Sequence, residues 1–301
     1  MERYRQAVTV LPEPLRTCAL RLDEGSMTRA EEVRLRSGRV PTVVLPEGER
    51  ELPGAETVTV EQLERLVEIA SRWSVHTVLE QLRDGYLTVE GGHRLGLCGR
   101  AVCREGRVQT LCHLSGANLR IARQICGAAR SVVHRLWQEG QLENTLILAP
   151  PGAGKTTLLR DLIRCFSEGE GCPGLRVAVA DERGELAAVW QGSAQMELGR
   201  RTDVLTGCTK AVGIPMLLRG MNPQVIAVDE ITVQEDICAM EQAVGCGVAL
   251  LATAHGNGME DLRRRTLYRQ MMDKGIFRKV ITIRVTRGER RLTVTSVEEE
   301  I

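Results

Sequence analysis

The chain has 301 residues, 43% hydrophobic and 26% charged. This is the usual balance of a globular protein, and it excludes disorder, collagen and coiled-coil compositions for most of the length. Its 40 basic and 39 acidic residues give a net charge of +1, so it lacks the basic excess of a dedicated nucleic-acid-binding protein. Aromatic residues are only 3%, which disfavours stacking platforms for single strands.

The ten cysteines are scattered along the chain, and none forms a C-x-x-C pair. Cys98, Cys103 and Cys112 lie close together, but their spacing fits no zinc pattern. The first residues lack the apolar core of a secretory signal peptide, so free thiols in a reducing cytoplasm are expected. No apolar run reaches the ~18 residues of a membrane span. These features predict a cytoplasmic protein.

The first part of the chain, over 1–135, mixes short strand and helix patterns, as in an α+β domain. Apolar spacing predicts a helix over 59–73. Two strands, 86–89 and 95–98, flank a pair of glycines and are expected to form a hairpin. Further strands are expected over 40–45 and, as a strand or a helix start, over 115–123.

The second part, over 136–301, changes to alternating strands and helices. Short apolar strands are expected at 145–149, 176–180, 225–228 and 248–252, with a helix over 155–166. This alternation predicts a parallel sheet covered on both faces, with ligands at the carboxyl ends of its strands. A closing hairpin is expected from 280–285 and 292–297.

A phosphate-binding loop (P-loop) is the most specific motif of the sequence. It matches G-x-x-x-x-G-K-[ST] except that Ala149 replaces the first glycine. Glycines let the backbone N–H groups point at a phosphate chain, and the following helix places its positive end beneath it. Lys155 is expected to reach the β- and γ-phosphates and Thr156 to bind Mg²⁺. The candidate nucleotide-binding residues are Pro151, Gly152, Ala153, Gly154, Lys155, Thr156 and Thr157.

Two acids follow the apolar strand 225–228. P-loop nucleotidases use an aspartate at a strand end to hold Mg²⁺, which suits Asp229. Glu230 is expected to polarise the attacking water. In an extended strand the two side chains would point to opposite sides, so each could take one role. A solvated strand end is the alternative interpretation.

Three further groups are candidates for the same edge of the sheet. His255 ends the strand after the two acids and is positioned to hydrogen-bond a γ-phosphate. Asp181 and Glu182 end the strand between the two motifs and could bind Mg²⁺ or orient water; a solvated turn is the alternative. An arginine is expected to neutralise the transferring phosphoryl group. With 36 arginines, spacing does not choose among Arg94, Arg120, Arg123, Arg200, Arg201 and Arg219.

An ordered set of short segments, covering nearly the whole chain, resembles the stage III sporulation protein AA family. In the second half these segments are Ala149–Thr157 (APPGAGKTT), Ala180–Leu186 (ADERGEL), Arg201–Leu205 (RTDVL), Met216–Glu230 (MLLRGMNPQVIAVDE) and Thr253–Gly256 (TAHG). In the first half they are Glu32–Arg36 (EVRLR), Gly91–Arg100 (GGHRLGLCGR) and Leu119–Arg123 (LRIAR). Only the P-loop is specific by itself; the ordered set is specific as a whole.

The family looks like a branch of the type II and type IV secretion ATPases. The resemblance implies a RecA-like P-loop ATPase domain beside a smaller N-terminal α+β domain, assembled into a homo-oligomeric ring of six subunits. It implies ATP and Mg²⁺ as ligands, and a place in the mother cell of a sporulating bacterium, peripheral to the membrane. The partners would be membrane subunits of the channel to the forespore, encoded in the same operon.

By the same resemblance, Lys155 and Thr156 contact nucleotide and Mg²⁺, and Asp229 and Glu230 fill the Walker B position with Glu230 as the catalytic base. Asp181 and Glu182 then match an acidic box and His255 a histidine box, and Arg219 lies where those ATPases carry an arginine before Walker B. One departure is that Ile231, Thr232 and Val233 follow Glu230 where such ATPases usually carry an arginine.

Three functions stay open from the sequence. The first is a ring-shaped ATPase motor that energises or assembles the channel. The second is a nucleic-acid-stimulated translocase or RNA-binding NTPase, which the near-neutral charge and scarce aromatic residues disfavour. The third is a nucleotide-gated scaffold with little turnover, which Glu230 disfavours.

Overall fold

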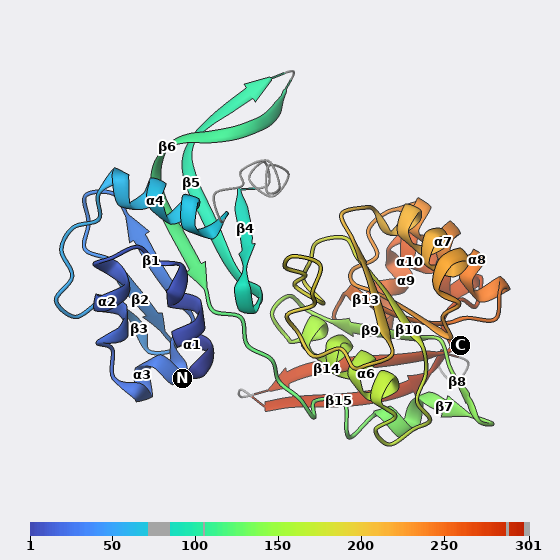
Figure 1. Cartoon of the computed structure of the whole chain (residues 1–301). Helices are drawn as coiled ribbons and strands as arrows, with labels where there is room; N and C mark the ends of the chain where they lie inside the picture. The colour runs from blue at the N-terminus through green and yellow to red at the C-terminus, as the bar shows by residue number, and fades with distance from the viewer. Residues whose placement is uncertain (72–84, 105, 287–288, 298–301) are drawn as a thin grey trace. The chain divides into compact units, whose positions relative to one another are not determined.

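The computed structural model describes residues 1–71, 85–104, 106–286 and 289–297 (Figure 1). The chain forms two compact units, Met1–Arg123 with Ala188–Gln195 and Gln124–Ala187 with Met196–Ile301. The first unit thus ends before residue 135, where the sequence suggested a boundary. One reason is that the buried Asp161 carboxylate accepts the backbone N–H of Ala129 at 2.7 Å, which ties this stretch to the second unit. The division into two domains with separate roles stays a prediction.

The first unit is built on a six-stranded antiparallel sheet with the order β3-β2-β1-β6-β5-β4. Its strands are β1 (Glu32–Arg36), β2 (Thr42–Leu45), β3 (Gly48–Glu51), β4 (Tyr86–Val89), β5 (His93–Arg104) and β6 (Arg107–Arg120). Its helices are α1 (Glu2–Ala7), η1 (Val8–Val10), α2 (Leu15–Leu20), α3 (Glu24–Arg29), α4 (Val60–Ala70) and η2 (Glu90–Gly92). One apolar cluster joins helices and sheet, with Tyr4, Val33 and Leu63 among its buried members.

Most of the expected elements of this unit are present. The predicted helix is α4, which Thr59 and Gln62 start with a reciprocal capping box. Its predicted last residues, 72 and 73, lie outside the described residues. The predicted hairpin is β4 and β5, and the stretch 115–123 supplies the end of β6, a strand rather than a helix start. Strand β1 was recognised as a family segment but not as a strand.

The second unit is a seven-stranded sheet with the order β11-β10-β12-β13-β9-β14-β15. The first six strands are parallel, and only β15 is antiparallel. The strands are β9 (Thr145–Ala149), β10 (Val177–Asp181), β11 (Thr202–Thr206), β12 (Val225–Val228), β13 (Ala249–His255), β14 (Lys279–Thr286) and β15 (Glu289–Ser296). A two-stranded ribbon, β7 (Trp137–Gln138) with β8 (Gln141–Leu142), precedes them after η3 (Val133–Leu136).

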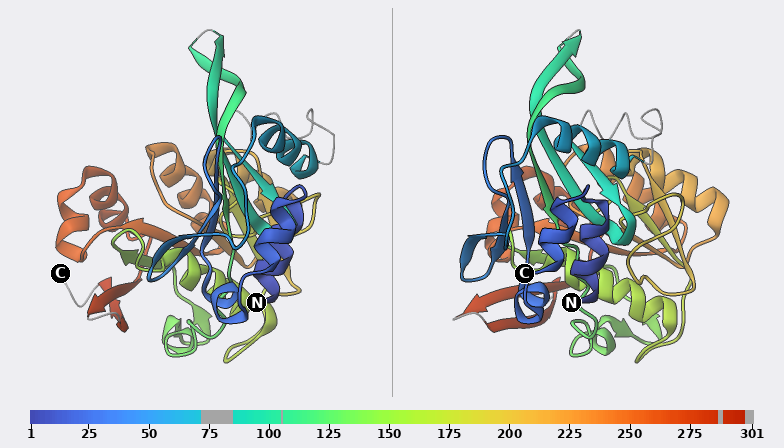
Figure 2. Two further views of the ribbon diagram at one scale, coloured as in Figure 1. Left: turned by 90° about the vertical axis from the view of Figure 1, so that its left-hand side faces the viewer. Right: turned by 60° about the vertical axis from the view of Figure 1, so that its left-hand side comes forward.

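Helices cover both faces of this sheet, as Figures 1 and 2 show. Helix α6 (Lys155–Glu168) packs against β9, β10 and β13. On the other face, one apolar cluster joins the strands to the remaining helices. These helices are α7 (Lys210–Met221), α8 (Gln234–Gly245), α9 (Met259–Arg264) and α10 (Thr266–Asp273). Every residue of β9, β10 and β12 is buried, as expected of parallel strands covered on both sides.

The predicted parallel sheet and closing hairpin are confirmed, with strand bounds within a few residues of those expected. Strand β11 was missed because its alternating, half-exposed side chains belong to a sheet edge rather than to a buried run. Within the described part of the chain, none of the helices is long and apolar enough to cross a membrane.

Candidate functional site

The P-loop connects β9 to α6 at the carboxyl edge of the sheet. Gly152 and Gly154 have φ angles of +73° and +103°, which only glycine adopts at little cost. Ala149 is the last residue of β9 and pairs with His255, so this position of the motif is extended and needs no glycine. No side chain caps the start of α6, and its first backbone N–H groups are therefore available to an anion.

Lys155 is the first residue of α6 and is 7% exposed. Its Nζ donates to the carbonyl oxygens of Ala149 at 3.2 Å and Pro150 at 3.3 Å, and lies 2.7 Å from Nδ1 of His255. Burial lowers the pKa of Lys155, while the carboxylates of Glu230 and Asp229 oppose that shift. The ammonium group thus lies inside the loop, facing both acids.

Asp229 follows β12 and faces the next residue of α6. Thr156 Oγ1 donates to Asp229 Oδ2 at 3.0 Å, and Thr253 Oγ1 donates to Asp229 Oδ1 at 2.5 Å. The structure therefore brings together the hydroxyl and the carboxylate that the sequence proposed for Mg²⁺. Hard oxygen donors of this kind suit Mg²⁺.

The expectation that Asp229 and Glu230 point to opposite sides of a strand is wrong. Strand β12 ends at Val228, and Glu230 has a φ of +44°. This left-handed residue turns the chain, so strand alternation no longer applies. Glu230 pairs with Nε2 of His255 through Oε1 and with Arg183 at 2.8 Å through Oε2, and both acids face the P-loop.

His255 ends β13 and lies between Lys155 and Glu230. Its Nδ1 accepts from the lysine and its Nε2 pairs with the carboxylate, which fits the neutral tautomer with the proton on Nε2. Arg265 fixes its backbone by donating to the His255 carbonyl at 3.0 Å. A continuous chain of contacts therefore runs from Lys155 through His255 and Glu230 to Arg183.

The adjacent acids of β10 have separate environments. Asp181 is 2% exposed, and its carboxylate accepts the backbone N–H groups of residues 185, 186 and 187. Burial raises its pKa, which these hydrogen bonds oppose. Asp181 therefore holds a turn. Glu182 instead pairs with the buried Lys210, whose Nζ is also 3.8 Å from Asp236.

The structure does not bring Arg219 to the P-loop of its own chain. Arg219 is exposed in the last turn of α7, next to Leu218, which lines a pocket at the opposite edge of the sheet. Arg200 pairs with Glu168 at 3.0 Å, and Arg201 donates to the Ser167 carbonyl at 2.6 Å.

In the first unit, the other three arginine candidates have local partners. Arg123 donates to the Ala30 carbonyl, Arg120 lies 3.5 Å from Glu32, and Arg94 stacks over Tyr86. Each of these contacts lies within the first unit.

Sequence reasoning missed the contacts of Arg183, Lys210 and Thr253. Thr253 Oγ1 accepts the Glu230 N–H at 2.9 Å and so links the two acids that follow β12. A hydroxyl inside a buried apolar strand is the signal that could have identified it. Lys210 is one of only four lysines and starts a helix, which was the available signal there.

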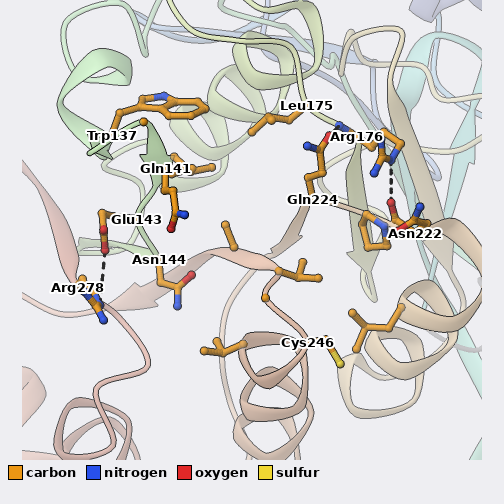
Figure 3. Close-up of a pocket in the computed structure, with 18 residues that line it drawn as sticks. Trp137, Gln141, Glu143, Asn144, Leu175, Arg176, Asn222, Gln224, Cys246 and Arg278 are labelled. Carbon is orange, nitrogen blue, oxygen red and sulfur yellow. Dashed lines mark hydrogen bonds and ion pairs between the residues drawn. The ribbon is translucent and has the colours of Figure 1, made fainter.

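A pocket of about 740 Å³ lies at the other edge of the sheet (Figure 3). Its lining comes from the segments that precede β9, β10, β12, β13 and β14, including Asn144, Arg176, Asn222, Cys246 and Arg278. It is therefore at the amino ends of the parallel strands, whereas ligands of such sheets bind at the carboxyl ends, where the P-loop lies.

Residues 1–297 match the family model described as "Sporulation stage III, protein AA". The chain is 36% identical to stage III sporulation protein AA of Bacillus subtilis, over 93% of this chain and 90% of that protein. It is also 28% identical to the uncharacterized protein ycf45 of Porphyra purpurea, over 61% of this chain and 31% of that one.

Two solved structures have the same fold. The pilus retraction motor PilT with bound ADP superposes with a TM-score of 0.62 at 17% identity, over 88% of this chain and 78% of that one. The Legionella pneumophila ATPase DotB gives a TM-score of 0.57 at 16% identity, over 88% of this chain and 76% of that one. At these identities the likeness is one of fold, and it confirms the RecA-like P-loop class.

Proposed function

Because this chain belongs to the stage III sporulation protein AA family, we propose that it is an ATPase that energises or assembles the channel between mother cell and forespore. The observation that carries the proposal is the convergence of Lys155, Thr156, Asp229, Glu230 and His255 at the carboxyl edge of one sheet. The proposal is also supported by the shared fold of PilT, a pilus retraction motor, and DotB, an ATPase.

The residues would act as follows. The backbone N–H groups at the start of α6, which no side chain caps, bind the phosphates of ATP, and Lys155 exchanges its carbonyl partners for phosphate oxygens. Thr156 and Asp229 would hold Mg²⁺, which neutralises phosphate charge when bound. Glu230 takes the proton of the attacking water. The Nε2–H of His255, which pairs with Glu230 in this structure, is the donor that would serve the terminal phosphate.

The proposed assembly is a homo-oligomeric ring, hexameric by analogy with the secretion ATPases. A P-loop ATPase hydrolyses slowly without an arginine supplied in trans, and Arg219 faces away from its own site. We place the ring in the cytoplasm of the mother cell, held at the membrane by membrane subunits of the channel. No observation on the described residues favours nucleic acid as a partner.

The test is ATP hydrolysis by the purified full chain over a concentration series, with molar mass from light scattering on the same samples. We expect specific activity to rise as a ring forms. Lys155→Ala should lose nucleotide binding, and Glu230→Gln should keep binding but lose turnover by at least about 10²-fold. Lys274→Ala is the matched control, because it removes the same charge from an exposed pair with Glu241. Normal turnover by Lys155→Ala would exclude this site.

A further inference from the structure

Arg290 lies on β15 and contacts the P-loop from a strand far away in sequence. Its Nε donates to the Ala153 carbonyl at 3.0 Å. A Cβ atom built on Gly154 would lie 3.4 Å from that Nε and 3.9 Å from Cδ and Cζ. The flat side chain thus packs along the backbone of Ala153 and Gly154 in the P-loop. Arg290 is exposed, and no carboxylate of the described residues pairs with it.

The strand order defines which end of a nucleotide would reach Arg290. β9 lies between β13 on one side and β14 on the other. Asp229, Glu230 and His255 all lie on the β12–β13 side and mark the position of the terminal phosphate. A phosphate chain that lies in the loop therefore directs its nucleoside end away from those strands, toward β14 and β15, where Arg290 lies.

The chemistry of arginine suits that end. A guanidinium is planar, stacks on aromatic rings, and carries five N–H donors, of which the Ala153 carbonyl occupies one. Resting on the proposed ATPase function, we propose that Arg290 binds the nucleoside end of the nucleotide, by stacking on the base and donating to the ribose. The proposal makes Arg290 a ligand for ATP and ADP alike, acting in the same subunit as the P-loop.

The experiment compares ADP with inorganic tripolyphosphate, which fills the phosphate site but has no nucleoside. In the Arg290→Ala full chain we expect ADP to bind about tenfold more weakly, with tripolyphosphate binding unchanged. The KM for ATP should rise by a similar factor while kcat stays within about twofold, because a contact equal in ground and transition states affects only binding. Arg290→Lys should resemble the alanine variant, because a lysine ammonium is not planar and does not offer paired N–H donors in a fixed geometry.

Arg291→Ala is the matched control. Arg291 pairs with Arg284 in the hairpin and lies on the face opposite that of Arg290. Arg291→Ala therefore removes the same charge one residue away and should change neither the ADP nor the tripolyphosphate affinity. Equal losses for ADP and tripolyphosphate would mean that Arg290 only supports the loop, and no loss for either would remove its role; both results overturn the inference while the ATPase proposal stands. If the wild-type chain binds neither ADP nor tripolyphosphate, both proposals fall.

Discussion

Four side chains from different parts of the sheet and its helices contact one another beside the P-loop. Lys155 of α6, His255 of β13, Glu230 after β12 and Arg183 after β10 form one chain of contacts. In it both oxygens of Glu230 are engaged, one by the histidine and one by the arginine. The proposed base is therefore positioned by two neighbours before any substrate binds.

Arg183→Ala is expected to lower kcat about three- to fivefold and leave ADP affinity unchanged. Arg183 is largely exposed, and a pair of this kind contributes no more than about 1 kcal/mol. Steady-state kinetics beside an ADP titration measure both quantities. Arg200→Ala, which breaks a pair with Glu168 elsewhere, should change neither. A drop in ADP affinity equal to the drop in kcat would contradict a positioning role.

Thr253→Val keeps the shape of the side chain but removes the hydroxyl that links Asp229 to the Glu230 amide. Because the site is buried, the unpaired groups should lower the free energy of unfolding by about 1–3 kcal/mol. Urea denaturation measures this, and turnover should fall with it because both acids lose a support. Thr282→Val on β14, outside the site, is the control; equal stability of the two variants would argue against the link.

Among the elements, β5 is fixed to the segment that follows β6 through a buried histidine. His93 is 0% exposed, and its Nδ1 accepts the Ala122 N–H at 3.0 Å. Burial, with a contribution from Arg3, lowers the pKa of His93 to about 4. The folded state thus disfavours the charged ring that the unfolded chain acquires near its ordinary value of about 6.5.

The sign of the pH dependence follows. Between pH 6.5 and 4 the unfolded chain binds the proton more readily, so the contribution of His93 is complete above 6.5 and is lost as the pH falls toward 4. The loss is up to about 3 kcal/mol. Urea unfolding at a series of pH values, compared with His93→Gln, should show this slope only in the wild type. His113→Gln, at an exposed histidine, is the control. If the free energy of unfolding of His93→Gln depends on pH as steeply as that of the wild type, the dependence belongs to other groups.

For the whole molecule, the second unit contains every residue of the P-loop site described above, and the arginines that it brings there include Arg183, Arg265 and Arg290. Arg219 belongs to the same unit but lies at the other edge of its sheet. A role for Arg219 in hydrolysis thus requires a second copy of the chain, which is the arrangement of the proposed ring.

A mixing experiment tests this arrangement. Lys155→Ala has an inactive P-loop site but keeps Arg219, whereas Arg219→Ala keeps an intact P-loop site but lacks the arginine. If Arg219 acts in trans, an equal mixture of the two inactive variants should recover about a quarter of the wild-type rate, because that fraction of sites in a random ring has both groups. Arg263→Ala in place of Arg219→Ala is the control. An active Arg219→Ala chain, or no recovery on mixing, would exclude this arginine.

The sequence alone determined the parallel sheet, the P-loop and the two acids after β12. Each of these features depends on a short run of residues. Buried strands need continuous apolar runs, and a phosphate-binding loop needs glycines before a helix. The positions of His255 and Glu182 at strand ends made them candidates, and the family segments chose Arg219 among the arginines. The structure explains why alanine is tolerated at the first position of the motif, because Ala149 is the extended last residue of β9.

Only the tertiary structure decided which distant side chains meet at the loop. Arg183 reaches Glu230 because β10 and β12 are neighbours, and Arg290 reaches Ala153 because β14 and β15 extend the sheet beside β9. It also turned Glu230 toward the P-loop by a left-handed residue, and left Arg219 at the other edge. Strand order and backbone turns arise from packing over the whole sheet. The local sequence around each of the 36 arginines therefore does not indicate which of them reach the P-loop.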